Sequence, residues 1–115
     1  MRFERLESIA RREVRLTLFH LPSHLRQAAQ PCRIEVSDHH PTDELMGLFE
    51  GCPLGQTLSE DPADWPRITL FLGAIWDEVM GDARAYREEV RVTLLHELGH
   101  YLGLDEDQVA ALGLA

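Results

Sequence analysis

The chain has 115 residues, of which 44% are hydrophobic and 27% are charged, and its formal net charge is −9. This length predicts a single domain, residues 1–115, with one modest core, and excludes a multi-lobed enzyme. Twenty acidic residues against eleven basic ones repel nucleic-acid phosphates, so nucleic-acid binding is not expected. No apolar run approaches the roughly 20 residues needed to cross a bilayer, so we expect a water-soluble protein without a membrane span.

The first third of the chain predicts two helices. Apolar residues recur every three or four positions between Phe3 and Phe19, with charges between them, which is typical of an amphipathic helix. Glutamates are interleaved with the arginines of this segment, so it resembles neither a signal peptide nor a transit peptide, and we expect a cytoplasmic protein. Pro22 is expected to break the helix, and Ser23 to cap a second one that runs to Gln30.

Three short segments in the middle of the chain carry strand signals. Arg33 to Asp38 alternates polar and apolar residues, as a half-buried strand does. Leu45 to Phe49 is a second, shorter candidate. Arg67 to Leu72 is the strongest of the three because it is rich in β-branched and aromatic residues. The segment 55–66 before it reads as a polar loop.

Neither the two cysteines nor the two neighbouring histidines of the middle segment form a recognisable motif. Cys32 and Cys52 are not spaced as a metal-binding CxxC pair, and we expect free thiols in a reducing compartment, with a disulfide as the alternative. His39 and His40 fall in the segment HHPTDE and are expected to be exposed turn residues. Whether this turn approaches a cleft is left open.

The last third of the chain predicts a long helix from Ala83 to Leu102, capped by Asp82 and ended by Gly103. Its expected core stripe consists of Tyr86, Val90, Leu94, Leu98 and Tyr101. A short helix from about Asp105 to Leu112 follows. Helices, then about three strands, then the long helix make an α+β arrangement in which a small sheet packs on helices.

The segment HELGHYLGLDE places two histidines, His96 and His100, one helical turn apart on the same face and off the core stripe. Two imidazoles so spaced can bind one Zn²⁺ at roughly 2.0 to 2.1 Å. Glu97 points about 100° further around the helix, close enough to reach a metal-bound water as general base. In such a site zinc lowers the pKa of water and polarises a carbonyl, while the glutamate moves a proton to the leaving amine.

A catalytic zinc site also needs a third protein ligand. Gly103 allows the chain to turn sharply after His100, which brings three adjacent acids toward the metal face. The spacing HExxHxxGxxE selects Glu106, with Asp105 and Asp107 as alternatives. Composition alone would produce the whole extended motif in roughly 4 of 10,000 such chains, so the motif is specific. The alternative interpretation is that the glycine only ends the helix and the acids form the favourable first turn of the next one.

Taken together, LMGLFEGCPL, RITLFLG and EEVRVTLLHELGHYLGL resemble the zincin metalloproteases, and in particular a family of small bacterial minimal zincins with the motif HExxHxxGxxD. The resemblance implies an α+β fold with a small mixed sheet of three to four strands packed on the active-site helix and the N-terminal helices. It implies that His96 and His100 bind one Zn²⁺ per chain and that Glu97 is the general base. Glu106 would be the final ligand, where the family has aspartate.

Zincins hold an extended peptide by adding it to an edge strand above the zinc. We therefore expect Leu45 to Glu50 to form that edge and Arg67 to Leu72 to lie inside the sheet. No oxyanion-stabilising residue is predicted, because Tyr101 falls near the core stripe. The predicted function is a zinc-dependent metallopeptidase that acts on peptide or protein segments, although iron, cobalt or manganese suit the same donors. A non-catalytic binding module with a zincin shell and a zinc hydrolase for another substrate are the alternatives.

Overall fold

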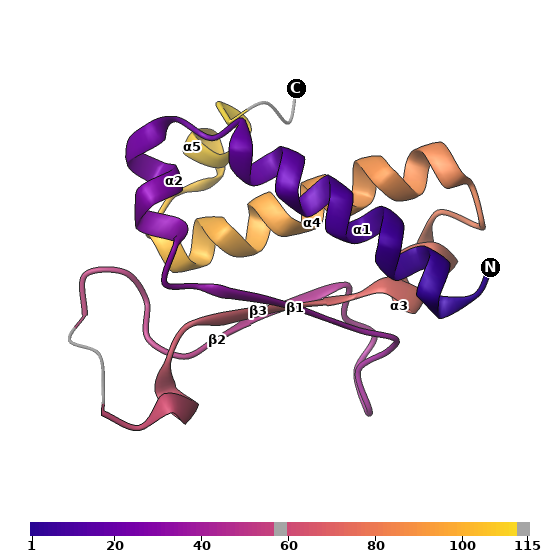
Figure 1. Cartoon of the computed structure of the whole chain (residues 1–115), viewed down its shortest axis with the longest axis horizontal. Helices are drawn as coiled ribbons and strands as arrows, with labels where there is room; N and C mark the ends of the chain where they lie inside the picture. The colour runs from indigo at the N-terminus through magenta and orange to yellow at the C-terminus, as the bar shows by residue number, and fades with distance from the viewer. Residues whose placement is uncertain (57–59, 113–115) are drawn as a thin grey trace.

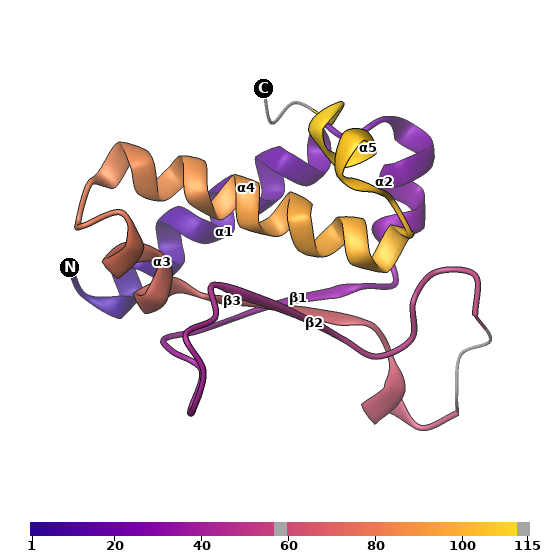
Figure 2. The ribbon, with the colours of Figure 1, turned by 180° about the vertical axis from the view of Figure 1, so that it is seen from behind.

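The computed structural model of the chain describes residues 1–56 and 60–112. Its elements follow in the order α1 (Phe3–Phe19), α2 (Ser23–Ala29), β1 (Arg33–Ser37), β2 (Gly47–Glu50), η1 (Pro62–Asp64), β3 (Arg67–Phe71), α3 (Leu72–Glu78), α4 (Ala83–Leu102) and α5 (Glu106–Ala110). Helices α1 and α4 lie side by side over one face of the sheet (Figures 1 and 2). The predicted α+β class is therefore confirmed.

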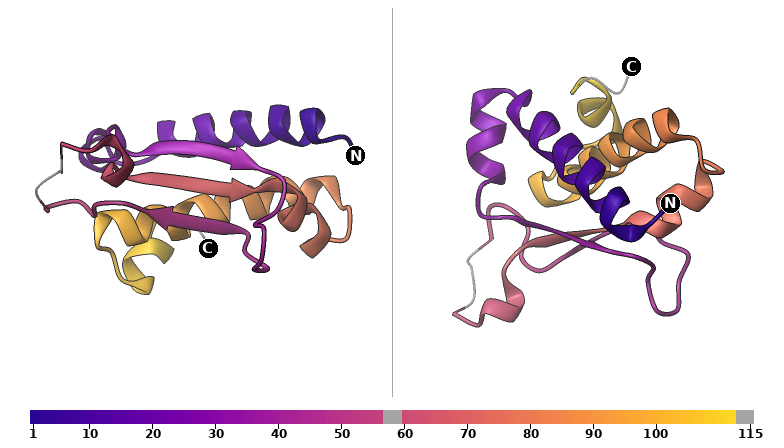
Figure 3. Two further views of the ribbon diagram at one scale, coloured as in Figure 1. Left: turned by 90° about the horizontal axis from the view of Figure 1, so that it is seen from below. Right: turned by 45° about the vertical axis from the view of Figure 1, so that its right-hand side comes forward.

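The three strands of the described residues form one mixed sheet in the order β1-β3-β2. Strand β3 is parallel to β1 and antiparallel to β2. The strand with the strongest sequence signal is therefore central, and β2 is an edge strand, as expected from chain order. Seen from below, α1 runs along the β1 side of the sheet and α4 along the β2 side (Figure 3).

The core lies between the sheet and the two long helices. The predicted stripe of α4 is confirmed, because all of its members are buried: Tyr86, Val90, Leu94, Leu98 and Tyr101. The hydroxyl of Tyr86 donates a hydrogen bond to Leu6 O at 2.9 Å, and that of Tyr101 to Ala28 O at 3.0 Å. Burial raises the pKa of both tyrosines. These bonds satisfy the buried hydroxyl groups, so Tyr101 is a core residue rather than a free donor.

Helix α3 is absent from the sequence prediction, which continued the third strand to Leu72. The strand ends at Phe71, and Leu72 already begins α3. The reason is Gly73, which a local reading takes as a strand terminator. Its backbone N donates to Asp38 O at 2.9 Å, and a Cβ on Gly73 would lie 2.0 Å from Asp38 Oδ1. This glycine therefore serves the close approach of α3 to the turn after β1.

Other boundaries differ from the prediction by one or two residues, among them the ends of α2 at Ala29, of β1 at Ser37 and of β2 at Glu50. Ser23 is the first residue of α2 rather than its cap, and Pro22 occupies the N-cap position without a side-chain hydrogen bond. Proline is suited to the start of a helix because it has no N–H to leave unpaired. Strand β2 begins at Gly47 and not at Leu45. The helix and the strand are thus present as expected, with shifted ends.

Cys32 and Cys52, both within the described residues, are not joined by a disulfide, as expected. Cys32 is buried, and burial raises its pKa to about 11. A thiol that stays protonated at neutral pH is a poor nucleophile and packs like a small apolar side chain.

The turn after β1 is tied to α3 by His39. Its Nε2 lies 3.1 Å from Asp77 Oδ2, and its Nδ1 lies 3.3 Å from Asp38 Oδ1. The hydrogen bond with Asp77, helped by attraction to both carboxylates, raises the pKa of His39 above its ordinary value. His39 is exposed as predicted, whereas His40 is half-buried with its ring centroid 5.6 Å from that of Phe71.

Because the pKa of His39 is higher in the folded than in the unfolded chain, its bridge stabilises the fold fully below the unfolded pKa. This stabilisation is lost as the pH rises through the folded pKa. We expect Asp77→Asn to lower the pKa of His39 in an NMR titration of the metal-free protein, and the matched change Asp107→Asn in α5 to leave it unaltered. A His39 pKa that does not respond to Asp77→Asn would show that the bridge is absent in solution.

Candidate active site

Helix α4 carries the HELGH segment in its last two turns, and both of its ends form as the sequence predicts. Asp82 Oδ1 accepts a hydrogen bond from Ala85 N at 2.9 Å. Gly103 adopts a left-handed φ of 72° just after the helix, a conformation that strains other residues. The chain therefore turns away directly after the second histidine.

His96 and His100 are neighbours on the exposed side of α4. Their ring centroids are 5.1 Å apart, and the ring planes are nearly perpendicular, at 88°. The helix thus brings together the two imidazoles that the spacing selects, and both are accessible to an ion from solution.

Glu97 lies about 100° around the helix from His96, on a covered face, and is only 9% exposed. Its Oε2 is buried and has no hydrogen-bond partner among the residues that the structure describes. Buried polar atoms are nearly always paired, because leaving one bare costs about 1–3 kcal/mol, and more for a charged group. The simplest explanation for keeping this unfavourable group in the fold is that the Glu97 carboxylate acts on a ligand.

The first residue of the edge strand lies directly against Glu97. A Cβ placed on Gly47 would be 3.0 Å from Glu97 Cγ and 2.7 Å from Thr93 Cγ2. Thr93 is also buried, and its Oγ1 donates a hydrogen bond to Glu89 Oε1 at 3.4 Å. Sequence reasoning missed this contact because Gly47 and Glu97 are far apart in the chain and no local pattern links them.

The two histidines open onto a hollow of about 360 Å³ between the end of α4 and α5. Its lining consists of His96, Gly99, His100, Leu104, Asp105, Glu106 and Val109. Within residues 1–56 and 60–112, no three His, Cys, Asp or Glu side chains are grouped closely enough to hold a metal ion. The fold therefore brings the two histidines together and places two of the three candidate acids at the same hollow, without completing a ligand set.

The three candidate acids occupy different environments. Asp105 is the N-cap of α5: its Oδ1 accepts from Gln108 N, while Gln108 Oε1 accepts from Asp105 N, both at 2.8 Å. Glu106 is exposed and makes no hydrogen bond or ion pair within the described part of the chain. Asp107 does not line the hollow. The last helix thus begins at Glu106, one residue later than predicted, and it ends at Ala110.

Asp105 and Glu106 are expected to respond oppositely to alanine. Asp105→Ala removes the capping box and should lower the free energy of unfolding of the metal-free protein by about 1 kcal/mol, with little effect on zinc affinity. Glu106→Ala should lower zinc affinity by about 100-fold or more and leave the metal-free melting temperature unchanged. Calorimetric zinc titrations and thermal melts separate the two, with Asp107→Ala as the matched control. A larger loss of zinc affinity in Asp105→Ala would reverse the assignment of the third ligand.

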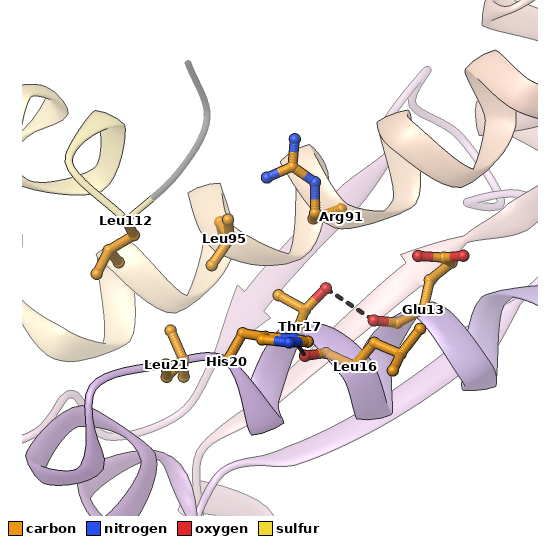
Figure 4. A pocket seen from close by; sticks show the side chains of 8 residues that line it. All are labelled: Glu13, Leu16, Thr17, His20, Leu21, Arg91, Leu95 and Leu112. Carbon is orange, nitrogen blue, oxygen red and sulfur yellow. Dashed lines mark hydrogen bonds between the residues drawn. The ribbon is translucent and has the colours of Figure 1, made fainter.

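A different hollow, of about 270 Å³, lies between α1 and α4. Figure 4 shows its lining, which consists of Glu13, Leu16, Thr17, His20, Leu21, Arg91, Leu95 and Leu112. Thr17 Oγ1 donates to Glu13 O at 2.7 Å, and His20 Nδ1 lies 2.7 Å from Leu16 O. The Thr17 hydroxyl and the His20 imidazole are thus bonded to the backbone of α1. The described lining of this hollow contains no second imidazole that could bind a metal together with His20.

Helix α4 thus carries two exposed histidines one turn apart with a buried glutamate beside the first, the arrangement of an HExxH motif on a helix. A family model of zincin-like metallopeptidases matches residues 24–114 of the chain. The match covers well over half of the sequence and includes the sheet, α4 and α5, so the chain belongs to the zincin-like metallopeptidase family. A search of curated proteins found no match.

Proposed function

We propose that this protein is a zinc-dependent peptidase that hydrolyses peptide bonds in extended segments of peptides or proteins. The observation that carries the proposal is Glu97 Oε2, which is buried and unpaired within the described residues, on the residue next to the exposed His96. Membership of the zincin-like metallopeptidase family supports the same assignment.

The proposed donors for one zinc ion per chain are His96, His100 and Glu106. His96 and His100 supply imidazole nitrogens from adjacent turns, and Glu106 supplies a carboxylate at the same hollow. Glu106 is exposed and unpaired in the described structure, so its side chain can rotate toward the histidines. When bound, zinc supplies Lewis-acid chemistry, which polarises a carbonyl and makes water more acidic.

The proton transfers fall to Glu97. Its Oε2 accepts the proton of the attacking water and returns it to the nitrogen of the leaving amine. Packing under β2 restricts the rotamers of the Glu97 side chain, so the carboxylate occupies a narrow range of positions before substrate binds. Within the described residues, Glu97 Oε2 is not committed to a hydrogen bond with a neighbouring group.

The edge strand β2 provides a place for the substrate backbone. Phe71 N donates to Met46 O at 2.9 Å, which makes these two opposed residues a hydrogen-bonded pair. Antiparallel pairing alternates, so the next pair along, Gly47 with Leu70, is not hydrogen-bonded. The N–H and C=O groups of Gly47 and Phe49 therefore face the open edge, where an extended peptide can add as a further strand.

Charge and cysteine chemistry complete the proposal. A net charge of −9 opposes nucleic-acid binding, and peptide segments remain the proposed partners. In the part of the chain that the structure describes, no helix is long and apolar enough to cross a membrane. A cytoplasmic location is part of the proposal, because two cysteines that are not joined by a disulfide in the described structure suit a reducing compartment.

The proposal is tested by digesting a peptide library with zinc-loaded protein and identifying new termini by mass spectrometry. We expect cleavage that a chelator stops and added zinc restores. The competing function, a non-catalytic binding module with a zincin shell, is favoured by the incomplete ligand set in the described residues. It predicts that peptides bind the zinc-loaded protein and remain intact.

A further inference from the structure

We infer that Gly47 is a positioning residue that sets Glu97 beneath the edge strand, at the point where a peptide backbone would lie. The catalytic meaning of this inference rests on the proposed function. Its evidence is the packing of three residues from two elements, Gly47 of β2 with Thr93 and Glu97 of α4.

The space for the stem of Glu97 exists because residue 47 has no side chain. A Cβ there would lie 2.7 Å from Thr93 Cγ2, 3.0 Å from Glu97 Cγ and 3.7 Å from Glu97 Cδ. Carbon atoms do not approach to 2.7 Å without bonding, and a contact at 3.0 Å forces the partner to shift by a few tenths of an ångström. Gly47 is not among the glycines with positive φ, so its backbone would accept alanine. The requirement for glycine at this position therefore comes from space and not from backbone conformation.

The side chain of Thr93 has little freedom to move away from position 47. It is 7% exposed, and its Oγ1 donates to Glu89 Oε1 one turn earlier on α4, at 3.4 Å. A β-branched side chain in a helix has few χ1 rotamers, and this hydrogen bond favours the one that leaves its methyl group toward Gly47. Any side chain at position 47 would therefore meet Thr93 and would also displace Glu97.

Gly47 also faces the open edge with its backbone groups, because its pair with Leu70 is not hydrogen-bonded. The Cα of Gly47 thus lies against the stem of Glu97. The N–H and C=O of the same residue are available to a peptide added at the edge. The distance between the carboxylate of Glu97 and the peptide depends on how closely β2 approaches α4. Misplacing a reacting group by about 1 Å can cost on the order of 100-fold in rate.

Three variants separate positioning from packing: Gly47→Ala, Thr93→Ser and the double variant. Gly47→Ala creates both close contacts. Thr93→Ser removes the methyl group behind the tighter contact and keeps the hydroxyl that bonds to Glu89. The double variant therefore retains only the contact with Glu97 Cγ, and Thr93→Ser alone serves as its reference.

We expect Gly47→Ala to lower the melting temperature by roughly 5 °C and kcat by about 10- to 100-fold. KM and the zinc content should change little, because alanine keeps the backbone groups and no metal ligand is altered. The double variant should recover most of the melting temperature while kcat stays low. If the double variant recovered kcat together with the melting temperature, Gly47 would have a packing role only. That result would overturn the inference.

Crystal structures of the metal-free parent and double variant supply a readout that does not depend on turnover. We expect the Glu97 carboxylate to move by a few tenths of an ångström or more in the double variant. An unmoved Glu97 would contradict the inference even if kcat fell. If the parent itself cleaves no peptide, the proposed function fails, and the position of Glu97 still decides whether Gly47 sets it.

Discussion

Replacing Glu97 with glutamine is expected to lower kcat/KM for peptide hydrolysis by about 1,000-fold, because an amide of nearly the same shape cannot accept the proton of the attacking water. Zinc content should stay at the parental value, since both histidines are unchanged. The measurement is the initial rate on a single peptide, with each protein loaded to equal zinc content. Parental rates in Glu97→Gln would remove the general base from the proposed mechanism.

The same substitution is expected to stabilise the metal-free protein. Glu97 Oε2 is buried without a partner in the described structure, and a neutral amide costs less to bury than a carboxylate. The free energy of unfolding in urea should rise by about 1 kcal/mol, the trade expected where a fold carries an unfavourable group for its activity. The control is Glu88→Gln, which neutralises an exposed carboxylate on the same helix. It should change neither kcat/KM nor the free energy of unfolding appreciably.

Replacing His96 with alanine is expected to remove the metal. Zinc-binding free energies of about 10–16 kcal/mol are shared among few ligands, so the loss of one imidazole should weaken binding by roughly 1,000-fold. His100→Ala should behave in the same way, because the two rings are adjacent and both are exposed. Metal analysis of the purified proteins and zinc titration by calorimetry measure the loss.

His24→Ala is the matched control, because His24 is exposed on α2, away from the hollow that the two α4 histidines line. It should retain parental zinc affinity. A His96→Ala protein that binds one zinc with parental affinity would show that the metal is held elsewhere in the chain, and the proposed ligand set would then be wrong.

Helix α4 could be predicted from sequence because its signals act over short distances. Asp82 bonds to an amide three residues away, and the left-handed Gly103 ends the helix through its own backbone. The apolar stripe needs only the period of the helix. The placement of His96 and His100 on one exposed face follows from the same geometry.

The surroundings of Glu97 could not be predicted, because they depend on a strand contributed from elsewhere in the chain. Periodicity places the residue after His96 around the helix, but it does not show that Glu97 is buried with Gly47 of β2 against its stem. Gly73, which follows the third predicted strand, has the local signature of a strand terminator, whereas the fold needs a glycine there for contact with another segment. At both places a glycine is required by a distant contact, which has no local signature.

The role of Asp105 has a signature in the sequence. An acid followed three residues later by Gln108 is the sequence signature of a capping box, and the structure contains both of its hydrogen bonds. That signal separates Asp105, which caps α5, from Glu106, which lines the hollow without a partner in the described structure. The capping signal, added to the motif spacing, therefore favours Glu106 over Asp105 as the third metal ligand more than the spacing alone does.

One measurement bears most directly on the claim that a zinc ion on α4 and the carboxylate of Glu97 together cut peptide bonds. A peptide library is incubated with zinc-loaded parent, with zinc-loaded Glu97→Gln and with chelator-treated parent, and new termini are identified by mass spectrometry. We predict new termini with the zinc-loaded parent alone. Cleavage of the same bonds by Glu97→Gln or by the chelated protein, or no cleavage by the fully loaded parent, would contradict that claim.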